Sequence, residues 1–380
     1  MQSRIRPRGN LISVGTDTLQ MMKTILSVAV AFGMACMSLA APRQVLMPGD
    51  PAPELRVSQW IKGDPIARFE KGQVYVVELW ATWCGPCRRS VPHLTELAKK
   101  HGKDVVIIGI SVREVGDDIV GGVRRFVAEM GDRMQYHVAI DSADKGTERL
   151  WQDAALRRGI PVAFIVGKDG RIAWIGHPMV MADPLQRVIE GNFDVSVSRA
   201  EFQKDVDRVM REEAGLALIA AAQEKGKEGL VAEALDELDS VFREIPELGR
   251  DVFRTKAVIL ATDEAGIRDL IGQAPGMLGA NASEALANAS LFIVRDMKRA
   301  DLDPKIERSA RLMAAAALKT MTKEMEIPVL YYVSMLYLQL EDFPTAATHL
   351  ERLLKAIPVN EETRSLIAEV QRLLDRARKG

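Results

Sequence analysis

The chain has 380 residues, of which 47% are hydrophobic, 27% are charged and 5% are aromatic. That length and composition are those of an ordinary globular protein with room for two hydrophobic cores. The formal net charge is −1, and Lys and Arg do not cluster along the chain, so no nucleic acid is expected as a partner.

The first forty residues have the pattern of an export signal. Lys23 precedes an apolar run over residues 25–35, and Ser38-Leu39-Ala40 has the small residues of a cleavage site. We therefore predict a signal peptide over residues 1–40, cleavage after Ala40, and a location in the periplasm or cell envelope.

Two other features of this segment leave alternatives open. The first twenty residues carry no apolar pattern, so the start is predicted to be mis-assigned, with Met21 or Met22 as the true start. A rival interpretation places a lipoprotein processing site at residues 33–36, which would leave Cys36 acylated at the new N-terminus.

The other two cysteines lie in a single tetrapeptide, Cys84-Gly85-Pro86-Cys87, which directly follows an apolar run over residues 74–80. A cysteine between a strand and a helix faces free backbone N–H groups and the positive end of the helix dipole, which stabilise a thiolate. Cys84 is therefore the expected nucleophile. Cys87, one helical turn later, is the expected resolving thiol. The Gly-Pro spacer favours a reductant over a strong oxidant.

Two other roles for the cysteine pair are less consistent with the sequence. A zinc site needs two more ligands, and the five histidines are scattered singly, so we expect no metal. A disulfide that closes a four-residue ring constrains little of the unfolded chain, so a purely structural bridge would add little stability. The redox-active Cys84–Cys87 pair is thus expected to work without a cofactor.

Residues 47–192 alternate between short β-branched runs and helical patterns, which predicts an α/β layer structure. The expected strands are 74–80, 105–112, 136–140, 162–166 and 171–175, with the last two forming an antiparallel hairpin around a Lys-Asp-Gly turn. The expected helices are 88–101, 123–130, 148–158 and 185–190.

The sequence Trp-Cys-Gly-Pro-Cys after a buried strand, followed by Ile160-Pro161 much later in the chain, resembles the thioredoxin fold. The resemblance covers about 145 residues. It implies that Pro161 is in the cis form and lies against the disulfide, and that the backbone of Ile160 pairs with an extended client. It also implies a client-binding rim that consists of Trp83, Pro86, Ile160, Pro161 and Gly176.

Glu78 lies on the first of these apolar strands, six residues before Cys84. A buried acid is costly unless it has a partner or a role. By resemblance to thioredoxin, Glu78 takes and returns the proton of Cys87. The alternative is a partly solvated acid at a strand end. Thioredoxin pairs its acid with a lysine on the neighbouring strand, and residues 105–112 contain none.

Residues 114–136 are an insertion relative to thioredoxin. Together with a Pro-Gly-Asp-Pro-Ala-Pro entry at 48–53, they resemble the exported TlpA and ResA branch of that family. That resemblance implies client proteins with disulfides as substrates and a membrane thiol donor as the reductant. The peroxiredoxins share the entry, but their peroxidatic cysteine motif is missing, so a peroxidase is the weaker interpretation.

From about Ser196 onward the chain has only helical patterns. Tyr337, Ala346 and Pro358 have tetratricopeptide spacing, and the pair Ala234 and Pro246 repeats its latter part. These helical hairpins resemble degenerate tetratricopeptide repeats. Their apolar faces are expected to form core more than a ligand groove, namely Leu235, Leu238, Phe242, Leu330, Tyr337 and Leu350.

Together these patterns predict an α/β thioredoxin-like domain over residues 41–192, with a central mixed sheet flanked by helices, followed by an all-helical, tetratricopeptide-like domain over 193–380. The expected function is an exported thiol-disulfide oxidoreductase that reduces client disulfides; an isomerase role stays open. The alternative is a binding or scaffold protein. In that case the helical half recruits a protein partner and the redox half is only a recognition surface.

Overall fold

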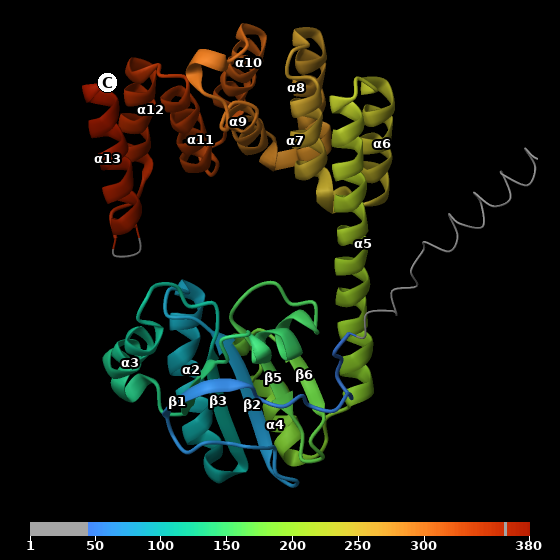
Figure 1. Cartoon of the computed structure of the whole chain (residues 1–380), viewed down its shortest axis with the longest axis vertical. Coiled ribbons are helices and arrows are strands. Elements are labelled where there is room, and N and C mark those ends of the chain that lie inside the picture. The colour runs from blue at the N-terminus through green and yellow to red at the C-terminus, as the bar shows by residue number, and fades with distance from the viewer. Residues whose placement is uncertain (1–44, 361–362) are drawn as a thin grey trace, which may run out of the picture. The chain divides into compact units, whose positions relative to one another are not determined.

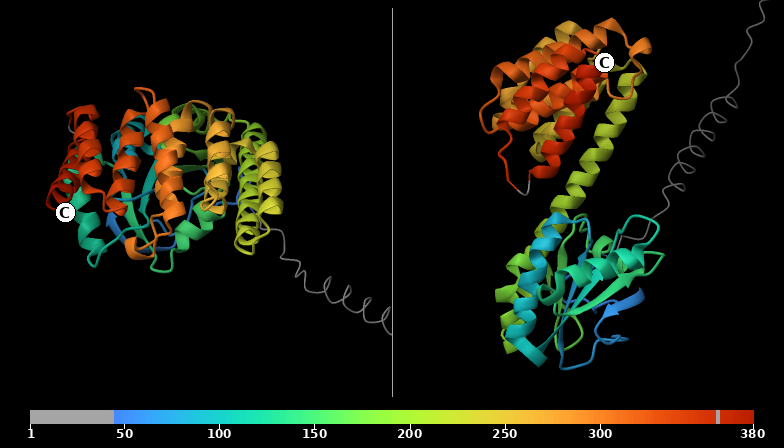
Figure 2. Two further views of the ribbon diagram at one scale, coloured as in Figure 1. Left: turned by 90° about the horizontal axis from the view of Figure 1, so that it is seen from above. Right: turned by 90° about the vertical axis from the view of Figure 1, so that its left-hand side faces the viewer.

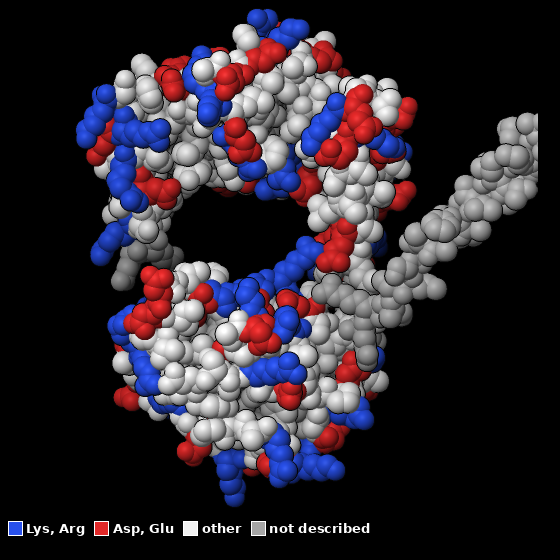
Figure 3. Space-filling model, viewed as in Figure 1, with Lys and Arg blue, Asp and Glu red and all other residues white. Residues whose placement is uncertain are grey.

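The computed structural model describes residues 45–360 and 363–380 (Figure 1). The predicted signal peptide, its cleavage site and Cys36 lie outside these residues. The chain divides into two units, one that ends at Phe202 and one over Gln203–Gly380. In both units, Lys and Arg are interspersed with Asp and Glu over the face that Figure 3 shows.

No helix within the described parts of the chain is both long enough and apolar enough to cross a membrane.

The first unit contains a six-stranded mixed sheet in the order β1-β4-β3-β2-β5-β6. β2 and β4 each run parallel to β3, and the remaining pairs are antiparallel, which confirms the predicted mixed sheet. All seven residues of β2 are buried because it lies in the middle of the sheet. The strands are β1 (Val57–Lys62), β2 (Val74–Trp80), β3 (Val105–Ser111), β4 (His137–Asp141), β5 (Val162–Val166) and β6 (Ile172–Gly176).

One face of this sheet packs against three helices, α2 (Gly85–His101), α3 (Ile119–Met130) and α4 (Ala182–Glu190) (Figures 1 and 2). Alternate residues of β2 point into that core because side chains along a strand point to opposite faces in turn. Aromatic side chains pack on the opposite face of the sheet, where Trp151 makes edge-on contacts with both Phe69 and Phe164. The short helices of this unit are η1 (Gly102–Asp104), η2 (Gly131–Arg133), η3 (Glu148–Asp153) and η4 (Pro178–Val180).

Two predicted elements differ from the structure. The expected helix over 148–158 is only the π-helical segment η3, and the chain then passes through Leu156 at a φ of 53°, a left-handed conformation that ends a helix. β1 was not predicted. It is an edge strand with two irregularities in its pairing, so the alternation of apolar and polar residues that marks a strand is lost.

The helix after the cysteine motif begins at Gly85, three residues earlier than predicted. Cys84 caps it, with the Cys84 sulfur accepting a hydrogen bond from the backbone N–H of Cys87. Pro86 fits in the first turn because the N–H that proline lacks has no partner within the helix there. The cap thus places both cysteines at the N-terminal end of α2.

The second unit is helical throughout its described residues, as predicted. Successive helices of this unit lie side by side, as Figures 1 and 2 show. The long helices are α5 (Val195–Lys227), which begins in the first unit, α6 (Val231–Glu244), α7 (Gly249–Ile259), α8 (Glu264–Leu278), α9 (Ala282–Phe292), α10 (Pro304–Thr320), α11 (Glu326–Gln339), α12 (Phe343–Ala356) and α13 (Arg364–Lys379). The short ones are η5 (Pro246–Leu248), η6 (Gly279–Asn281) and η7 (Arg299–Asp301).

The apolar faces of these helices form core, as predicted. Leu238, Leu330 and Leu350 are fully buried. Leu235, Phe242 and Tyr337 are partly buried, and each packs against a cluster of buried hydrophobic side chains. Ala346 is also fully buried. The tetratricopeptide character of these hairpins stays a prediction.

Gly109 of β3 lies beneath buried aromatic side chains, so Gly109→Ala is expected to destabilise the first unit. A Cβ there would lie 3.0 Å from Trp80 Nε1 and 3.0 Å from Tyr136 Cε2, and both rings are buried. Overpacking of this kind costs about 1–3 kcal/mol of unfolding free energy, measurable by urea denaturation. Gly122→Ala is the control, since its Cβ would meet nothing closer than Arg125 Nη2 at 4.0 Å and alanine favours a helix. Equal stabilities for the two variants would contradict the tight packing.

Candidate active site

Cys84 and Cys87 form a disulfide, with their Cα atoms 5.2 Å apart. Cys84 retains 4% of its surface exposed and Cys87 none. The Cys84 sulfur is 3.2 Å from the backbone nitrogen of Cys87, whose N–H is one of the free donors at the start of α2. A negative charge on Cys84 would be stabilised by this N–H and by the helix dipole, as a nucleophilic thiolate requires.

The loop before β5 packs directly against the disulfide. The Ile160–Pro161 peptide bond is cis, as predicted. The carbonyl oxygen of Ile160 lies 3.6 Å from Cys84 Sγ, close enough to accept a hydrogen bond from a protonated thiol. The motif and the cis-proline loop are 73 residues or more apart in sequence, and the fold brings them into contact.

The residues predicted to form the client rim differ in how far they are exposed to solvent. Trp83 is 55% exposed, Pro86 is exposed, and Ile160 is partly exposed. Pro161 is buried. Gly176 ends β6 and pairs with Ala163, two residues beyond Pro161, so it belongs to the same corner of the sheet. The structure thus offers an exposed aromatic ring and an exposed proline beside the disulfide.

Glu78 is fully buried in the middle of the sheet, between Gly109 of β3 and Ala163 of β5. Neither neighbour supplies a cation. Burial raises the pKa of Glu78 to about 8, and a hydrogen bond with Ser90 lowers it by less. Its carboxyl group is therefore mostly protonated at neutral pH. The complete burial of Glu78 contradicts the alternative of a partly solvated acid at a strand end.

Ser90 connects this acid to the cysteine motif and was not singled out from the sequence. Its hydroxyl oxygen lies 2.9 Å from the carbonyl oxygen of Cys87 and 3.4 Å from Glu78 Oε1. Ser90 itself is fully buried. The signal that could have found it is its position three residues after Cys87, on the same face of α2.

Two charged residues that follow β3, Arg113 and Glu114, also contact the motif and were not singled out from the sequence. Glu114 accepts hydrogen bonds from the Thr82 N–H at 2.8 Å, from the Thr82 hydroxyl at 2.6 Å and from the Ser111 hydroxyl at 2.6 Å. The backbone carbonyl of Arg113 accepts a hydrogen bond from Trp83 Nε1 at 2.9 Å. The available signal was two charged residues just beyond the carboxyl end of a central strand, where the sites of α/β proteins gather.

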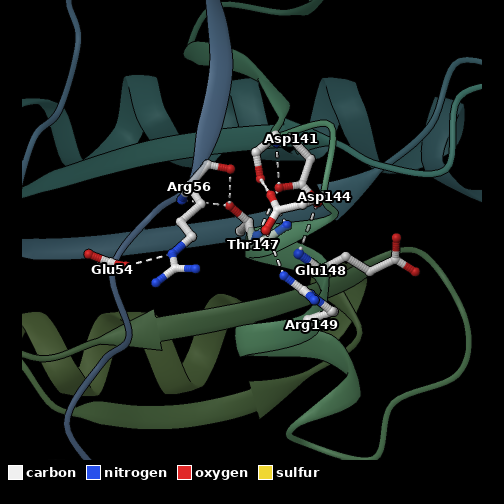
Figure 4. Close-up of polar contacts among 9 residues, drawn as sticks. Glu54, Arg56, Asp141, Asp144, Thr147, Glu148 and Arg149 are labelled. Atoms are coloured by element: carbon white, nitrogen blue, oxygen red, sulfur yellow. Dashed lines mark hydrogen bonds and ion pairs between the residues drawn. The ribbon is translucent and has the colours of Figure 1, made fainter.

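Asp141 fixes a polar cluster at the end of β4 (Figure 4). Its carboxylate accepts hydrogen bonds from the backbone N–H groups of Ser142, Thr147 and Glu148, at 2.8, 2.8 and 3.0 Å. Figure 4 shows the Glu148 side chain pointing away from Asp141. Asp141 therefore fixes the start of η3 and with it the position of Glu148. No group of three or more His, Cys, Asp or Glu side chains that could hold a metal ion occurs within 45–360 and 363–380.

Comparison with known proteins agrees with this geometry. A family model described as Redoxin matches residues 47–181. The thiol-disulfide oxidoreductase ResA of Bacillus thuringiensis (strain Al Hakam) is 32% identical over 152 residues, which are 39% of this chain and 79% of ResA. Protein FixW of Rhizobium leguminosarum is 35% identical over 155 residues, or 39% of this chain and 68% of FixW. The chain belongs to the ResA-type thiol-disulfide oxidoreductases of the thioredoxin-like fold.

As a ResA-type protein the chain is a disulfide oxidoreductase. The residues that the Redoxin model matches include the whole cysteine motif and the cis-proline loop. A solved structure of a thiol-disulfide isomerase from Corynebacterium glutamicum aligns with 38% of this chain and 96% of its own, at 23% identity and a TM-score of 0.32. These alignments cover 38–39% of this chain, and the Redoxin match ends at residue 181, before the helical unit.

Proposed function

We propose that this oxidoreductase reduces disulfides in client proteins, with Cys84 as the nucleophile, Cys87 as the resolving thiol and Glu78 as the proton carrier. The observation that carries the proposal is the placement of Cys84 at the N-terminus of α2, bonded to a buried Cys87. Of the two sulfurs, only that of Cys84 belongs to a residue with any exposed surface, so an outside disulfide meets it first.

The proposed exchange transfers two electrons in two steps. The Cys84 thiolate attacks one sulfur of the client disulfide, a mixed disulfide forms, and the other client sulfur leaves as a thiolate. Cys87 then loses its proton and attacks Cys84, so the Cys84–Cys87 disulfide forms and the client leaves with both sulfurs reduced. A dithiol donor returns the two electrons; a membrane thiol donor fits an exported protein.

The client rim is proposed to consist of Trp83, Pro86, Ile160, Pro161 and Gly176. Exposed aromatic and proline side chains bind extended chains without losing much conformational freedom. The 3.6 Å approach of the Ile160 carbonyl to Cys84 supports the idea that this backbone pairs with a client whose disulfide lies over Cys84.

Export to the periplasm or cell envelope is proposed from the apolar and small-residue pattern of residues 21–40, with lipid attachment at Cys36 as the alternative. The helical unit is proposed to be tetratricopeptide-like and to dock a protein partner. In the rival function the protein is only a binding scaffold. The intact Cys84–Cys87 bond favours the oxidoreductase, because a tether has no use for two thiols.

Replacing the resolving thiol tests the proposed function. The full-length Cys87→Ala variant is expected to accumulate mixed disulfides between Cys84 and client proteins, since nothing is left to displace the client. The adducts are detected by non-reducing electrophoresis and must disappear with dithiothreitol. Cys84→Ser/Cys87→Ala is the matched control and should trap nothing. If both variants capture the same proteins, binding does not depend on the thiol and the scaffold function is supported.

A further inference from the structure

We propose that Arg113 is a positioning residue that holds the two sides of the client rim at a fixed spacing. This inference rests on the proposed function, because it concerns how a client disulfide is presented to Cys84. Arg113 lies two residues beyond β3, and its hydrogen bonds within the described chain go to residues other than the two cysteines. Its contacts run instead to the two segments that flank the disulfide.

The first segment is the loop that leads to the cis-proline. The Arg113 guanidinium donates from Nη1 to the carbonyl oxygen of Arg158 at 2.8 Å, two residues before Ile160. Its Nε donates to Glu148 Oε1. The Glu148 side chain is only 6% exposed, against 30% for Arg113, so the ion pair is largely withdrawn from water. Such a pair holds its partners more firmly than an exposed one.

The second segment is the cysteine motif itself. The backbone carbonyl of Arg113 accepts a hydrogen bond from the Trp83 indole N–H at 2.9 Å. The next residue, Glu114, holds the Thr82 N–H and hydroxyl. One dipeptide thus orients the exposed ring that precedes Cys84 through its backbone and the cis-proline loop through its side chain.

The backbone conformation of Arg113 explains how one residue contacts both Trp83 and the cis-proline loop. Its φ of 55° is a left-handed conformation that an arginine adopts at a cost. The conformation turns the chain sharply after β3, so that the carbonyl faces Trp83 while the side chain faces Arg158. Strain of this kind persists only where surrounding contacts enforce it.

The backbone of Glu148, whose side chain anchors Arg113, is held in place by a hydrogen bond of its own. The Glu148 backbone N–H donates to Asp141, which also holds Thr147 and Ser142 (Figure 4). Lysine cannot replace arginine here. A single ammonium group lacks the planar fork that reaches a carboxylate and a carbonyl together.

The test variant is Arg113→Asn, because asparagine tolerates left-handed backbone and its short side chain lacks the guanidinium. With the full-length reduced protein, the rate constant for insulin reduction is expected to fall about tenfold, since small misplacements of positioned groups have effects of this size. The rate constant with the small disulfide dithiobis(nitrobenzoic acid), which needs no rim, should fall by a much smaller factor. Arg113→Lys should behave like Arg113→Asn.

Arg125→Gln is the matched control. It removes an exposed ion pair between Arg125 of α3 and Asp118, the residue that caps this helix, and should leave the rates with both disulfides unchanged. If Arg113→Asn does not fold, the same comparison is made with Glu148→Gln, which keeps an acceptor oxygen and should show a smaller insulin-selective loss. Equal losses with both disulfides in a folded variant, or no loss, would overturn the positioning role. A wild type that reduces neither disulfide would instead contradict the proposed function.

Discussion

Replacing Cys84 with serine is expected to lower the rate of insulin reduction to that of dithiothreitol alone. A serine hydroxyl is not ionised near neutral pH and forms no disulfide, so neither the attack nor the resolution step can occur. The sulfur of Cys84 also accepts a hydrogen bond from the N–H of Cys87 at the start of α2, and the hydroxyl oxygen of a serine can accept the same bond. The loss should therefore reflect chemistry and leave the fold intact.

The assay follows insulin precipitation with dithiothreitol, and the fold is checked by circular dichroism. Ser90→Ala is a useful comparison, because it changes a buried hydroxyl beside the motif without removing a thiol and should keep measurable turnover. Equal rates for wild type and Cys84→Ser would show that the motif does not turn over, and would favour a scaffold.

The cysteine motif was predictable because its neighbourhood is local. A buried strand, a tetrapeptide and a helix follow one another within residues 74–101, and each has a periodic pattern of its own. The cis form of Pro161 was also predicted, from the resemblance of the motif pair to thioredoxin. The strand pattern and the family resemblance thus agreed at the catalytic end of the sheet.

The polar contacts around the motif were not predictable, since they join residues distant in sequence. Arg113 reaches Glu148 and Arg158, 35 and 45 residues later, and nothing in the spacing signals either contact. The expected helix over 148–158 failed for a related reason. Most of the apolar residues of this segment are buried, as in a helix that packs on a sheet. The backbone nevertheless adopts a left-handed conformation at Leu156, where the chain turns into the cis-proline loop.

Glu78→Gln is expected to stabilise the oxidised protein, and the gain should grow with pH. The folded-state pKa of about 8 lies above the ordinary value of 4.5 because burial disfavours the charged carboxylate. The proton held by Glu78 thus stabilises the fold fully below pH 4.5, and this stabilisation is lost as the pH rises to about 8. Glutamine does not titrate. The variant should therefore gain about 3–5 kcal/mol between pH 4 and pH 9, at about 1.4 kcal/mol per pKa unit.

Urea denaturation of the oxidised wild type and Glu78→Gln at pH 4, 6, 8 and 9 measures this difference. Glu96→Gln, a 75%-exposed acid on α2, is the control and should show no such trend. A stability difference that does not change with pH would mean that Glu78 ionises at its ordinary pKa and is reached by water.

The same substitution should slow reduction of the Cys84–Cys87 disulfide. When a donor thiolate attacks Cys84, the sulfur of Cys87 leaves and needs a proton, which the protonated Glu78 can supply below pH 8. Ser90 lies between the acid and the backbone of Cys87, so Glu78 and Cys87 belong to the same buried layer. The rate per dithiothreitol thiolate should be about tenfold lower in Glu78→Gln at pH 7. The wild-type rate should decline toward that of the variant above pH 8, and identical pH profiles would assign the proton to solvent.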